Sequence, residues 1–549
     1  MRKRLLCAVL SMMMLCVAPL ALASEEDPLG LKEYCVRGDG YVSEWCYNPP
    51  ITVSTVKSQP DNLYFEDGQD WEYNYWSVMQ ENEVGVKTTF DWVVANAQYE
   101  TKLNLSIASG DLPDYFECNG VQLRNVIEAG LVVDMTDLYD QYASDFLKEC
   151  VAADPNALTS ASSEGRLYAL PQPGEPYMNG GTSMYLRSDW MKQLGKEAPK
   201  TADELIELAY AFLNGDPDGN GEKDTFGLYM DNDLNGVNAF ANMYQLHPNI
   251  WVVDDQGKVS WGGLDEGMKP VLEKIAKLYA DGVIDHEFTV KDPTKASEDI
   301  AAGKHGLYFG GWSAGYWPLN LSIPNDADAD WEAYPLVSGT DQPATLSAPF
   351  ATTRYYVTTE SCKNPEVVIN LANWSLDSGY VQKLQLIEPR EDPTLHGRMN
   401  GYAGFQYEPA YKNLDIQQRL LKWQQTGDDS QLWPDDMDNW NTQQLFYSDH
   451  DQNGFSHKVT FGNEHSGLST VQYYMDNQMF VDDAYAAAPT ESMTENWSTL
   501  LALQNETYTK IITGEPVDAT FDAFVDQWKA AGGDQITSEI NEWYAANHG

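Results

Sequence analysis

From residue 51 onward, short segments with strand composition alternate with segments that have helical character. ITVSTVKS (51–58) and VGVKTTFDWV (84–93) are rich in β-branched residues, which favours strands. DWEYNYWSVMQENEVG (70–85) and YETKLNLSIASG (99–110) each end at a glycine, as helices commonly do. The alternation predicts an α/β fold with parallel strand layering.

The same alternation continues through the second half of the chain. Thr201 and Glu204 form a predicted capping box, and the apolar spacing behind them predicts a helix that ends at Gly215. APFATTRYYVTT (348–359) has strand composition, and we predict a strand before Gly310 and another in TFGLYM (225–230). The C-terminal stretch predicts two helices broken at Gly532-Gly533, and its apolar stripe is assigned to core packing.

The N-terminus has the pattern of a secretory signal peptide. A basic MRKR start precedes an apolar stretch and the small-residue site Ala21-Leu22-Ala23, so residues 1–23 are predicted to be removed and 24–50 to form a polar leader. Lipid attachment at Cys16 is the alternative, although Leu15 stands where a small residue is expected. We therefore expect an extracytoplasmic protein, with a lipoprotein as the alternative, and no later stretch has the roughly 18 apolar residues of a membrane span.

Composition narrows the classes of partner. The formal net charge is −49, and the loss of Arg2, Lys3 and Arg4 with the signal peptide makes it three units more negative. A surface of this charge disfavours nucleic acid and anionic lipid. The odd number of cysteines left in the mature chain argues against a disulfide scaffold, although Cys35 and Cys46 form a candidate pair. The 17 Trp and 32 Tyr suit a surface that stacks on sugar rings, with ordinary core packing as the alternative.

The segment NGDPDGNGEKDTFG (214–227) has the spacing of a calcium loop. Oxygen ligands at alternate positions would come from Asp216, Asp218, Asn220, the carbonyl of Glu222 and Asp224, with Gly221 at the turn. Position 12 is Gly227, where a calcium-sensing loop carries a bidentate Glu. The pattern predicts a structural Ca²⁺ site rather than a switch; the alternative is a polar turn without metal.

Several segments together resemble one family. IASGDLPDYF (107–116), GRLYALPQ (165–172), the run from Met184 through the calcium loop, GKHGLYFGGW (303–312) and the end of the chain (507–544) are similar to extracellular solute-binding proteins of ABC transporters. The closest similarity is to the sugar-binding subgroup that includes alginate-binding and LipO-like proteins. Thr225 departs from this subgroup, whose alginate-binding members place a further acidic ligand there.

This resemblance implies a two-lobe α/β periplasmic-binding-protein fold with a hinge and an interlobe ligand cleft. By analogy, lobe 1 would comprise 51–168 plus 346–390, and lobe 2 would comprise 169–345 plus 391–549. The protein would be a monomer without enzymatic activity. It would capture an oligosaccharide and deliver it to the permease subunits of an ABC importer.

Sugar clefts combine aromatic faces with a few fixed polar groups. Trp312 is the first candidate, because it follows a Gly-Gly turn at a strand end and matches the stacking position of the resembled family. Glu117 and Asn119 follow a predicted strand, and Trp71 and Trp76 are placed on one predicted helix. Ordinary core or surface roles are the alternatives for each. The further candidates are Tyr177, Trp317, Arg354 and Trp433, the last in a predicted polar loop.

Two other functions compete with oligosaccharide capture. A secreted glycoside hydrolase or polysaccharide lyase remains open, because the 83 acidic residues could supply the two placed carboxylates of a hydrolase. An adhesive protein would show repeats and an anchor, which the sequence lacks. The excess of Asp and Glu over Lys and Arg favours a neutral sugar over a uronate.

Overall fold

The computed structural model describes residues 41–61, 63, 65, 67–378 and 403–548. The predicted signal peptide, most of the predicted leader, Cys35 and the predicted lobe boundary at 390/391 lie outside the described residues. The chain divides into two compact units, 1–99 with 387–405 and 100–386 with 406–549. Among the described residues, no helix has both the length and the apolar character needed to cross a bilayer.

The first unit is built on a parallel pair of strands. β1 (Ile51–Gln59) pairs with β2 (Val86–Ala95), and α2 (Tyr75–Val84) connects them. Gly85 ends this helix at φ 67°, and a Cβ there would lie 2.4 Å from the backbone oxygen of Tyr47. The two predicted strands and the predicted helix end are confirmed.

Trp71 and Trp76 do not share a helix, so that prediction is wrong. The side chain of Asn74 accepts hydrogen bonds from the backbone N–H groups of Trp76 (2.8 Å) and Ser77 (3.1 Å) and thereby caps α2. Such an N-cap fixes the start of a helix, and Trp71 lies before it.

An antiparallel sheet organises one part of the second unit. Its strand order is β3 (Tyr115–Cys118), β13 (Arg354–Thr358), β6 (Leu170–Gln172), and a short hairpin joins β4 (Ser162–Ser163) to β5 (Arg166–Leu167). α14, α4 and α7 pack against the sheet, and α14 also contacts α5 and α6. The helices of this part are α4 (Gly120–Glu128), α5 (Thr136–Tyr142), α6 (Asp145–Ala152), α7 (Ala157–Ser160) and α14 (Val367–Leu376), and α3 (Asn96–Ser109) begins in the first unit and ends in the second.

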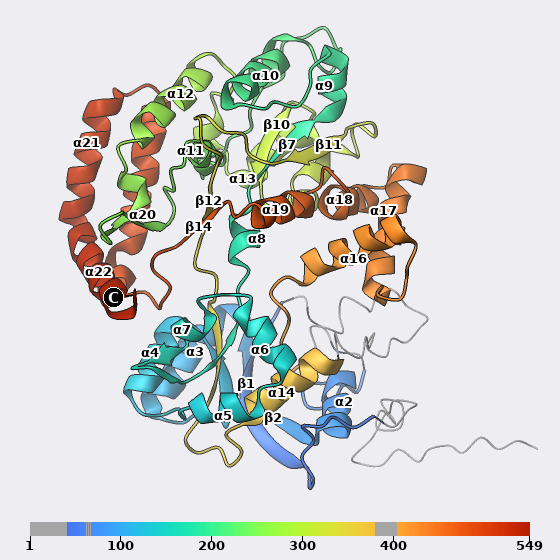
Figure 1. Ribbon diagram of the computed structural model, residues 1–549, viewed down its shortest axis with the longest axis vertical. Helices are drawn as coiled ribbons and strands as arrows, with labels where there is room; N and C mark the ends of the chain where they lie inside the picture. The colour runs from blue at the N-terminus through green and yellow to red at the C-terminus, as the bar shows by residue number, and fades with distance from the viewer. Residues whose placement is uncertain (1–40, 62, 64, 66, 379–402, 549) are drawn as a thin grey trace, which may run out of the picture. The chain divides into compact units, whose positions relative to one another are not determined.

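A second antiparallel sheet, in the order β10 (Leu307–Gly310), β7 (Ser183–Arg187), β11 (Trp331–Tyr334), organises the other part of this unit. Met184 of β7 and Phe309 of β10 share a large apolar core with side chains of the surrounding helices, including Leu272 and Leu500. The helices are α9 (Ser188–Leu194), α10 (Ala202–Asn214), α11 (Val237–Met243), α12 (Met268–Ala280), α13 (Pro293–Ala301), α20 (Glu491–Ile512), α21 (Val517–Trp528) and α22 (Asp534–His548). Figure 1 shows α20, α21 and α22 together at one side.

Shorter elements complete the second unit. The hairpin of β8 (Trp251–Val253) and β9 (Val259–Trp261) and the parallel pair of β12 (Leu346–Ala348) and β14 (Phe480–Asp482) matter most for the site. The remaining helices are α8 (Pro176–Gly180), α16 (Lys412–Thr426), α17 (Pro434–Asp449), α18 (Gln452–Phe461), α19 (Gly467–Asp476), the 3₁₀ turns η1 (Gly262–Leu264), η2 (Phe288–Val290) and η3 (Leu319–Ser322), and the π segment η6 (Lys529–Gly533).

Parallel layering was the wrong expectation for both three-stranded sheets. Strands that follow one another through a crossover helix pair in parallel, as β1 and β2 do. The central strands β13 and β7 instead pair with strands from distant parts of the chain, and those pairings are antiparallel. A long connection leaves the strand direction free, so local alternation did not determine it.

Several local predictions are confirmed and two are wrong. α10 begins after Thr201, whose hydroxyl accepts from the N–H of Glu204 (3.2 Å), and the C-terminal helices break at Gly532, where φ is 109°. The predicted capping box is confirmed only in this half, because the Glu204 carboxylate accepts from the N–H of Lys200 (2.7 Å) and not from that of Thr201. The predicted strand at 225–230 is only a pair of isolated bridges at Phe226 and Leu228. The predicted polar loop around Trp433 is the start of α17.

Candidate functional site

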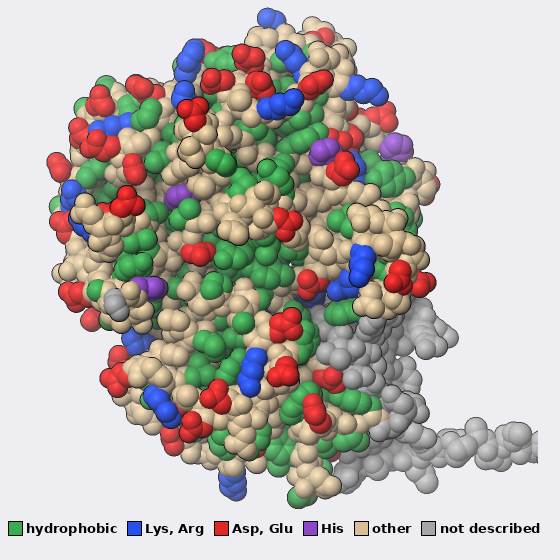
Figure 2. Space-filling model, in the orientation of Figure 1, with side chains coloured by type: hydrophobic (Ala, Val, Ile, Leu, Met, Phe, Trp, Pro, Cys, Tyr) green, Lys and Arg blue, Asp and Glu red, His purple; other side chains and the backbone are tan. Residues whose placement is uncertain are grey.

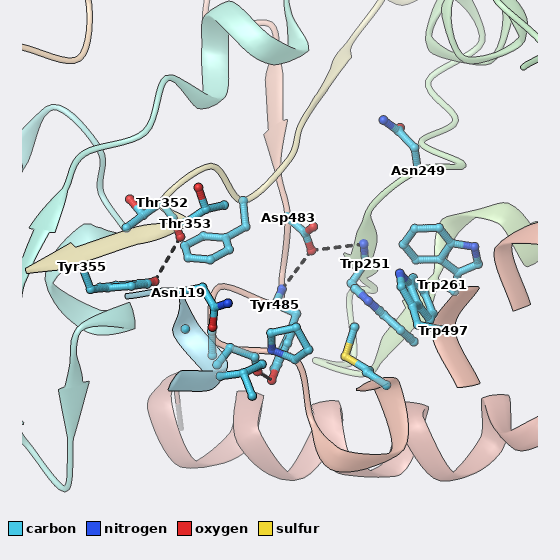
Figure 3. Close-up of a pocket in the computed structure, with 17 residues that line it drawn as sticks. Asn119, Asn249, Trp251, Trp261, Thr352, Thr353, Tyr355, Asp483, Tyr485 and Trp497 are labelled. Carbon is cyan, nitrogen blue, oxygen red and sulfur yellow. Dashed lines mark hydrogen bonds between the residues drawn. The ribbon is translucent and has the colours of Figure 1, made fainter. Parts of the chain in front are cut away.

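A cavity of about 470 Å³ lies in the second unit and is lined by 17 residues (Figure 3). The lining combines aromatic faces, hydroxyl and amide groups, and one carboxyl. It comprises Asn119, Gly120, Val121, Asn249, Trp251, Trp261, Phe350, Thr352, Thr353, Tyr355, Asp483, Tyr485, Ala487, Ala488, Pro489, Met493 and Trp497.

Three tryptophans form the aromatic wall of the cavity. Trp497 of α20 stacks on Trp251 of β8 at 5.5 Å between ring centroids and meets Trp261 of β9 edge-on at 4.7 Å. The indole N–H of Trp261 donates to Oε1 of Gln504 at 2.6 Å, which fixes its ring. Trp251 and Trp261 are buried, whereas Trp497 is half-buried, so Trp497 offers the most ring surface to a ligand.

Asp483 supplies the carboxyl of this cavity. Its Oδ1 accepts from the backbone N–H groups of Trp251 (3.2 Å) and Tyr485 (3.0 Å), and Figure 3 shows it between the aromatic wall and the side formed by Thr352, Thr353 and Tyr355. Burial, opposed by the backbone donors and assisted by the nearby charge of Asp482, raises the pKa of Asp483 to about 7. Near neutral pH the group therefore can accept or donate a hydrogen bond.

The start of α4 forms another side of the cavity. Asn119 caps this helix by accepting from the N–H of Gln122 at 3.0 Å. A Cβ on Gly120 would lie 3.1 Å from the Cβ of Ala488, so the helix start and the 487–489 segment are in close contact. A guanidinium N–H of Arg124 donates to the carbonyl of Pro489 at 2.7 Å and holds the same segment.

The lining residues come from both predicted lobes. Asn119 and the 350–355 segment belong to predicted lobe 1, while the aromatic wall and the 483–497 segment belong to predicted lobe 2. A cavity assembled in this way is where the predicted ligand cleft would lie. The lobe boundaries themselves stay a prediction.

Two smaller cavities adjoin the central one by sharing lining residues. A cavity of about 380 Å³ shares Asn119 and Val121 with it. Another, of about 320 Å³, shares Asn249, Trp261 and Trp497. The aromatic cavity therefore borders each of the two smaller ones, through different residues.

Of the nine residues predicted to bind ligand, only Asn119 lines the central cavity. Glu117 lies on β3, and Arg354 opens the neighbouring strand β13. A guanidinium nitrogen of Arg354 approaches Oε2 of Glu117 at 4.0 Å, with the Arg354 side chain 57% exposed. The structure thus brings these two predicted residues together, and their role in binding stays a prediction.

The predicted aromatic residues Trp312, Tyr177 and Trp317 lie on other surfaces of the second unit. Trp312 follows β10 and is half-buried against the apolar cluster around Leu468, and Trp317 is 46% exposed. Tyr177, on α8, stacks on Phe480 at 4.8 Å. None of the three lines a described cavity, so their predicted stacking on sugar stays untested.

The other predicted tryptophans have partners within the protein. In the first unit, Trp71 and Trp76 are both 8% exposed, and the Trp71 indole N–H donates to Oε1 of Gln59 at 3.0 Å. In the second unit, the guanidinium of Arg419 lies 3.9 Å from the ring centroid of Trp433, a cation–π contact at the start of α17. Whether any of them also meets a ligand stays a prediction.

The sequence did not reveal Trp251, Trp261, Trp497 or Asp483. Trp497 sits in a helix of mixed composition, and the β8–β9 hairpin is short, so neither carries a local signal. The one usable signal was the high tryptophan content, which indicates a sugar-stacking surface without locating it.

The aspartate-rich loop draws its polar groups together around Asn220. The Asn220 side-chain N–H₂ donates to Oδ2 of Asp218 (2.6 Å) and Oδ1 of Asp224 (3.3 Å), and Asp216 accepts from the N–H of Gly221 (3.1 Å). Burial is the largest cause of the raised pKa of Asp218, and the nearby charge of Asp224 adds to the rise. Among the described residues, no group of three or more His, Cys, Asp or Glu side chains is placed to hold a metal ion.

This loop partly fits Ca²⁺. Its donors are carboxylate, amide and carbonyl oxygens, the chemistry that Ca²⁺ prefers, and an N–H₂ group stands between two carboxylates where a cation would be favourable. Thr225 does not belong to the donor set, because it is buried and its hydroxyl donates to the carbonyl of Phe212 at 2.8 Å.

Comparison with known proteins identifies related binding proteins. No protein-family model matches the chain. It is 33% identical over 248 residues to the fructooligosaccharide ABC transporter substrate-binding protein FusA of Streptococcus pneumoniae, covering 42% of this chain and 45% of FusA. It is 29% identical over 221 residues to the polygalacturonan/rhamnogalacturonan-binding protein YtcQ of Bacillus subtilis, covering 40% of this chain and 43% of YtcQ. Each match thus spans less than half of the relative's length.

Longer alignments and solved structures extend the likeness over most of the chain. Lipoprotein LipO of Bacillus subtilis is 22% identical over 85% of this chain and 88% of LipO. An HMO-binding, ABC-transporter-associated solute-binding protein of Bifidobacterium longum infantis has a TM-score of 0.63 at 16% identity, covering 90% of this chain and 98% of that one. FusA in complex with kestose has a TM-score of 0.57 at 19% identity, covering 90% and 99%.

These likenesses confirm the predicted fold class and the predicted resemblance. The chain has the α/β fold of periplasmic-type solute-binding proteins. In sequence it is similar to the ABC transporter substrate-binding protein FusA, to the binding protein YtcQ and to lipoprotein LipO. These relatives are named as binding proteins or lipoproteins, not as enzymes.

Proposed function

We propose that this protein is an extracytoplasmic solute-binding component of an ABC importer that captures an oligosaccharide. The observation that carries the proposal is the cavity of about 470 Å³, in which three tryptophans face amide, hydroxyl and carboxyl groups. Aromatic rings stack on the apolar faces of sugars, while a few placed polar groups bind hydroxyls. The volume lies within the range of about 300–1,000 Å³ that is usual for ligand sites.

The relatives support capture over catalysis. FusA is named for fructooligosaccharide and YtcQ for polygalacturonan and rhamnogalacturonan, and both names describe binding. A canonical glycoside hydrolase needs two carboxyl groups flanking the scissile bond. Asp483 is the only carboxyl among the residues described as lining the central cavity, so hydrolysis at this place lacks its second group.

The residues of the cavity have different roles in binding. Trp497 offers a face for stacking, with Trp251 and Trp261 holding it in place. Asn119 and Asp483 supply hydrogen-bonding groups from different segments of the lining. Arg354 and Glu117, together with Trp312, Tyr177, Trp317 and the remaining predicted residues, are proposed as secondary contacts that a longer or closed complex would reveal.

Calorimetric titration of the mature protein with oligosaccharides of three to five units tests this function. We expect micromolar or tighter binding, about −8 kcal/mol, of at least one sugar that is recovered intact afterwards. Cleavage of the sugar would move the protein to the hydrolases or lyases. An absence of binding across fructan, starch, xylan, mannan, pectin and alginate fragments would overturn the sugar assignment.

The aspartate-rich loop is proposed to bind one structural Ca²⁺ through Asp216, Asp218, Asn220, Asp224 and the carbonyl of Glu222. Its support is the convergence of oxygen-bearing groups on Asn220. Solved structures of similar fold are described as an alginate-binding protein without calcium ion and as a FusA EF-hand mutant. A bound ion would neutralise the repulsion among the carboxylates and stabilise the loop that follows α10.

Delivery to membrane permease subunits completes the proposed role. It rests on the names of the relatives, which place FusA in an ABC transporter and LipO among lipoproteins. The acidic surface, visible in Figure 2 as many more red than blue side chains, suits an extracytoplasmic protein that avoids nucleic acid and anionic lipid. We propose that the monomer is the binding form.

A further inference from the structure

The three adjoining cavities have a consistent chemical order. Each outer cavity has four amide side chains in its lining, and the second also has the rings of Trp261, Trp497 and Tyr508. The central cavity has six aromatic rings. Asn104, Asn119, Gln122 and Asn125 line the first outer cavity. Asn238, Asn249, Gln504 and Asn505 line the second. Such an order suits a linear sugar chain whose middle units stack on rings and whose outer units bind through hydroxyls.

The charge of these linings has one sign. Each cavity has one carboxyl in its lining: Glu100 in the first, Asp483 in the centre and Asp233 in the second. No Lys, Arg or His is among the described residues that line the three cavities. The nearby cation Arg124 lies outside the linings and already donates to the carbonyl of Pro489.

We propose that these three cavities form one elongated site for an uncharged linear oligosaccharide, and that Glu100, Asp483 and Asp233 exclude sugars that carry carboxylates. This inference rests on the proposed function and assigns its substrate class. It is independent of the overall charge of the protein, because it depends only on the groups that line the site.

Coulomb repulsion explains the exclusion. A uronate bound across the three cavities meets one of the three carboxyls in every cavity, and the linings offer no cation to pair with it. Asp483 is half-buried and therefore poorly screened, whereas Glu100 and Asp233 are exposed and act weakly at physiological salt. The central carboxyl should thus account for most of the selectivity.

The related proteins show that ligand charge is a real alternative. FusA is named for a neutral fructooligosaccharide, while YtcQ is named for polygalacturonan, a chain of uronates. Relatedness therefore leaves the charge of the ligand open, and the lining of this chain's own cavities decides it.

A matched pair of ligands tests the proposal. The tightest neutral oligosaccharide from the titrations is compared with the same sugar oxidised at its primary hydroxyls to carboxylates, together with oligogalacturonate and oligoalginate of equal length. At pH 7.5 we expect the oxidised form and the uronates to compete at least about tenfold more weakly, and more weakly still at low salt. A uronate that binds as tightly as the best neutral sugar would overturn the proposal while leaving oligosaccharide capture intact. If no sugar of either class binds, the proposed function fails first.

Variants identify the carboxyl responsible. Asp483→Asn keeps an oxygen that can accept the two backbone N–H groups. At pH 7.5 it should reduce the ratio of the neutral-sugar affinity to the oxidised-sugar affinity by about fourfold, because about a quarter of the Asp483 carboxyls are already protonated at that pH. Glu100→Gln and Asp233→Asn are surface changes that should reduce this ratio by about twofold each, mainly at low salt. Asp255→Asn removes one exposed charge outside the cavities and serves as the matched control. Selectivity that is the same in Asp483→Asn and Asp255→Asn would show that Asp483 does not select the ligand.

Discussion

The central cavity and the aspartate-rich loop illustrate two ways in which this chain builds a polar site. The loop takes its groups from consecutive residues, Asp216 to Asp224, and its spacing is visible in the sequence. The cavity takes its groups from β8, β9, α4, α20 and the segments 350–355 and 483–489, which lie far apart in the chain. The first is a local motif and the second is a product of tertiary folding.

The difference also concerns what each site can do. The loop is exposed and follows the end of α10, so occupation by an ion would stabilise its own backbone. The cavity joins segments that are held by contacts such as Arg124 to Pro489, so a ligand there meets several segments at once. We therefore expect changes in the loop to alter stability and changes in the cavity to alter binding.

The largest expected effect is the loss of the stacking face. Trp497→Ala should weaken the binding of the tightest neutral sugar by about 2 kcal/mol, which is roughly 30-fold in affinity, because buried tryptophans dominate binding energies. Trp423→Ala is the matched control: Trp423 is also a half-buried helical tryptophan in edge-on contact with another, Trp440, and lies outside the cavities. It should lower the melting temperature and leave the affinity alone. Equal losses of affinity in both variants would contradict the assignment of the wall.

The next effect separates the loop from the cavity. In the wild type, Ca²⁺ at ten times its Kd should raise the free energy of unfolding by about 1.4 kcal/mol through linkage. The double variant Asp218→Asn, Asp224→Asn should lose this gain and keep its sugar affinity. Urea unfolding with Ca²⁺ and with chelator measures the first quantity, and calorimetry the second. A wild type that is equally stable in both conditions would make the loop a plain polar turn.

The smallest effect concerns the pH dependence of stability. Burial holds the pKa of Asp483 at about 7 in the folded protein, whereas the unfolded chain releases the proton near the ordinary value of 3.8. The folded state therefore binds more protons in this window, and the free energy of unfolding should fall as pH rises from about 4 to 7.

Asp483→Asn should make the fall in the free energy of unfolding less steep, by at most about 1.4 kcal/mol per pH unit. Glu175, whose pKa burial raises to about 7 against the opposing charge of Lys412, contributes in the same direction and remains in the variant. Urea unfolding at several pH values, compared between the wild type and Asp483→Asn, measures the difference. Parallel curves for the two proteins would show that Asp483 is not held protonated.

Local signals predicted much of the secondary structure. Glycines that end helices, as at Gly85 and Gly215, and the N-cap at Thr201 act through backbone groups of neighbouring residues, so a sequence window contains all that they need. The same holds for the break at Gly532, where φ is 109°. The segments that carried the family resemblance extended these local predictions to a fold class, which the solved structures confirm.

Such local signals did not predict most of the candidate site. Asn119 was predicted because it follows a predicted strand and its amide can accept from or donate to sugar hydroxyls. Trp312 had the same kind of local argument, yet it packs against the cluster around Leu468 and lines none of the described cavities. Position at a strand end therefore does not fix which surface a side chain meets.

The sequence by itself determined where helices start and stop, the spacing of the aspartate-rich loop and the relation to solute-binding proteins. Tertiary structure alone decided that the strands of both three-stranded sheets run antiparallel, and that Trp251, Trp261, Trp497, Asn119 and Asp483 surround one space. The physical reason is the range of the interactions. Caps and turns are satisfied within a few residues, whereas a cavity wall and the raised pKa of its carboxyl depend on which distant segments exclude water from the same place.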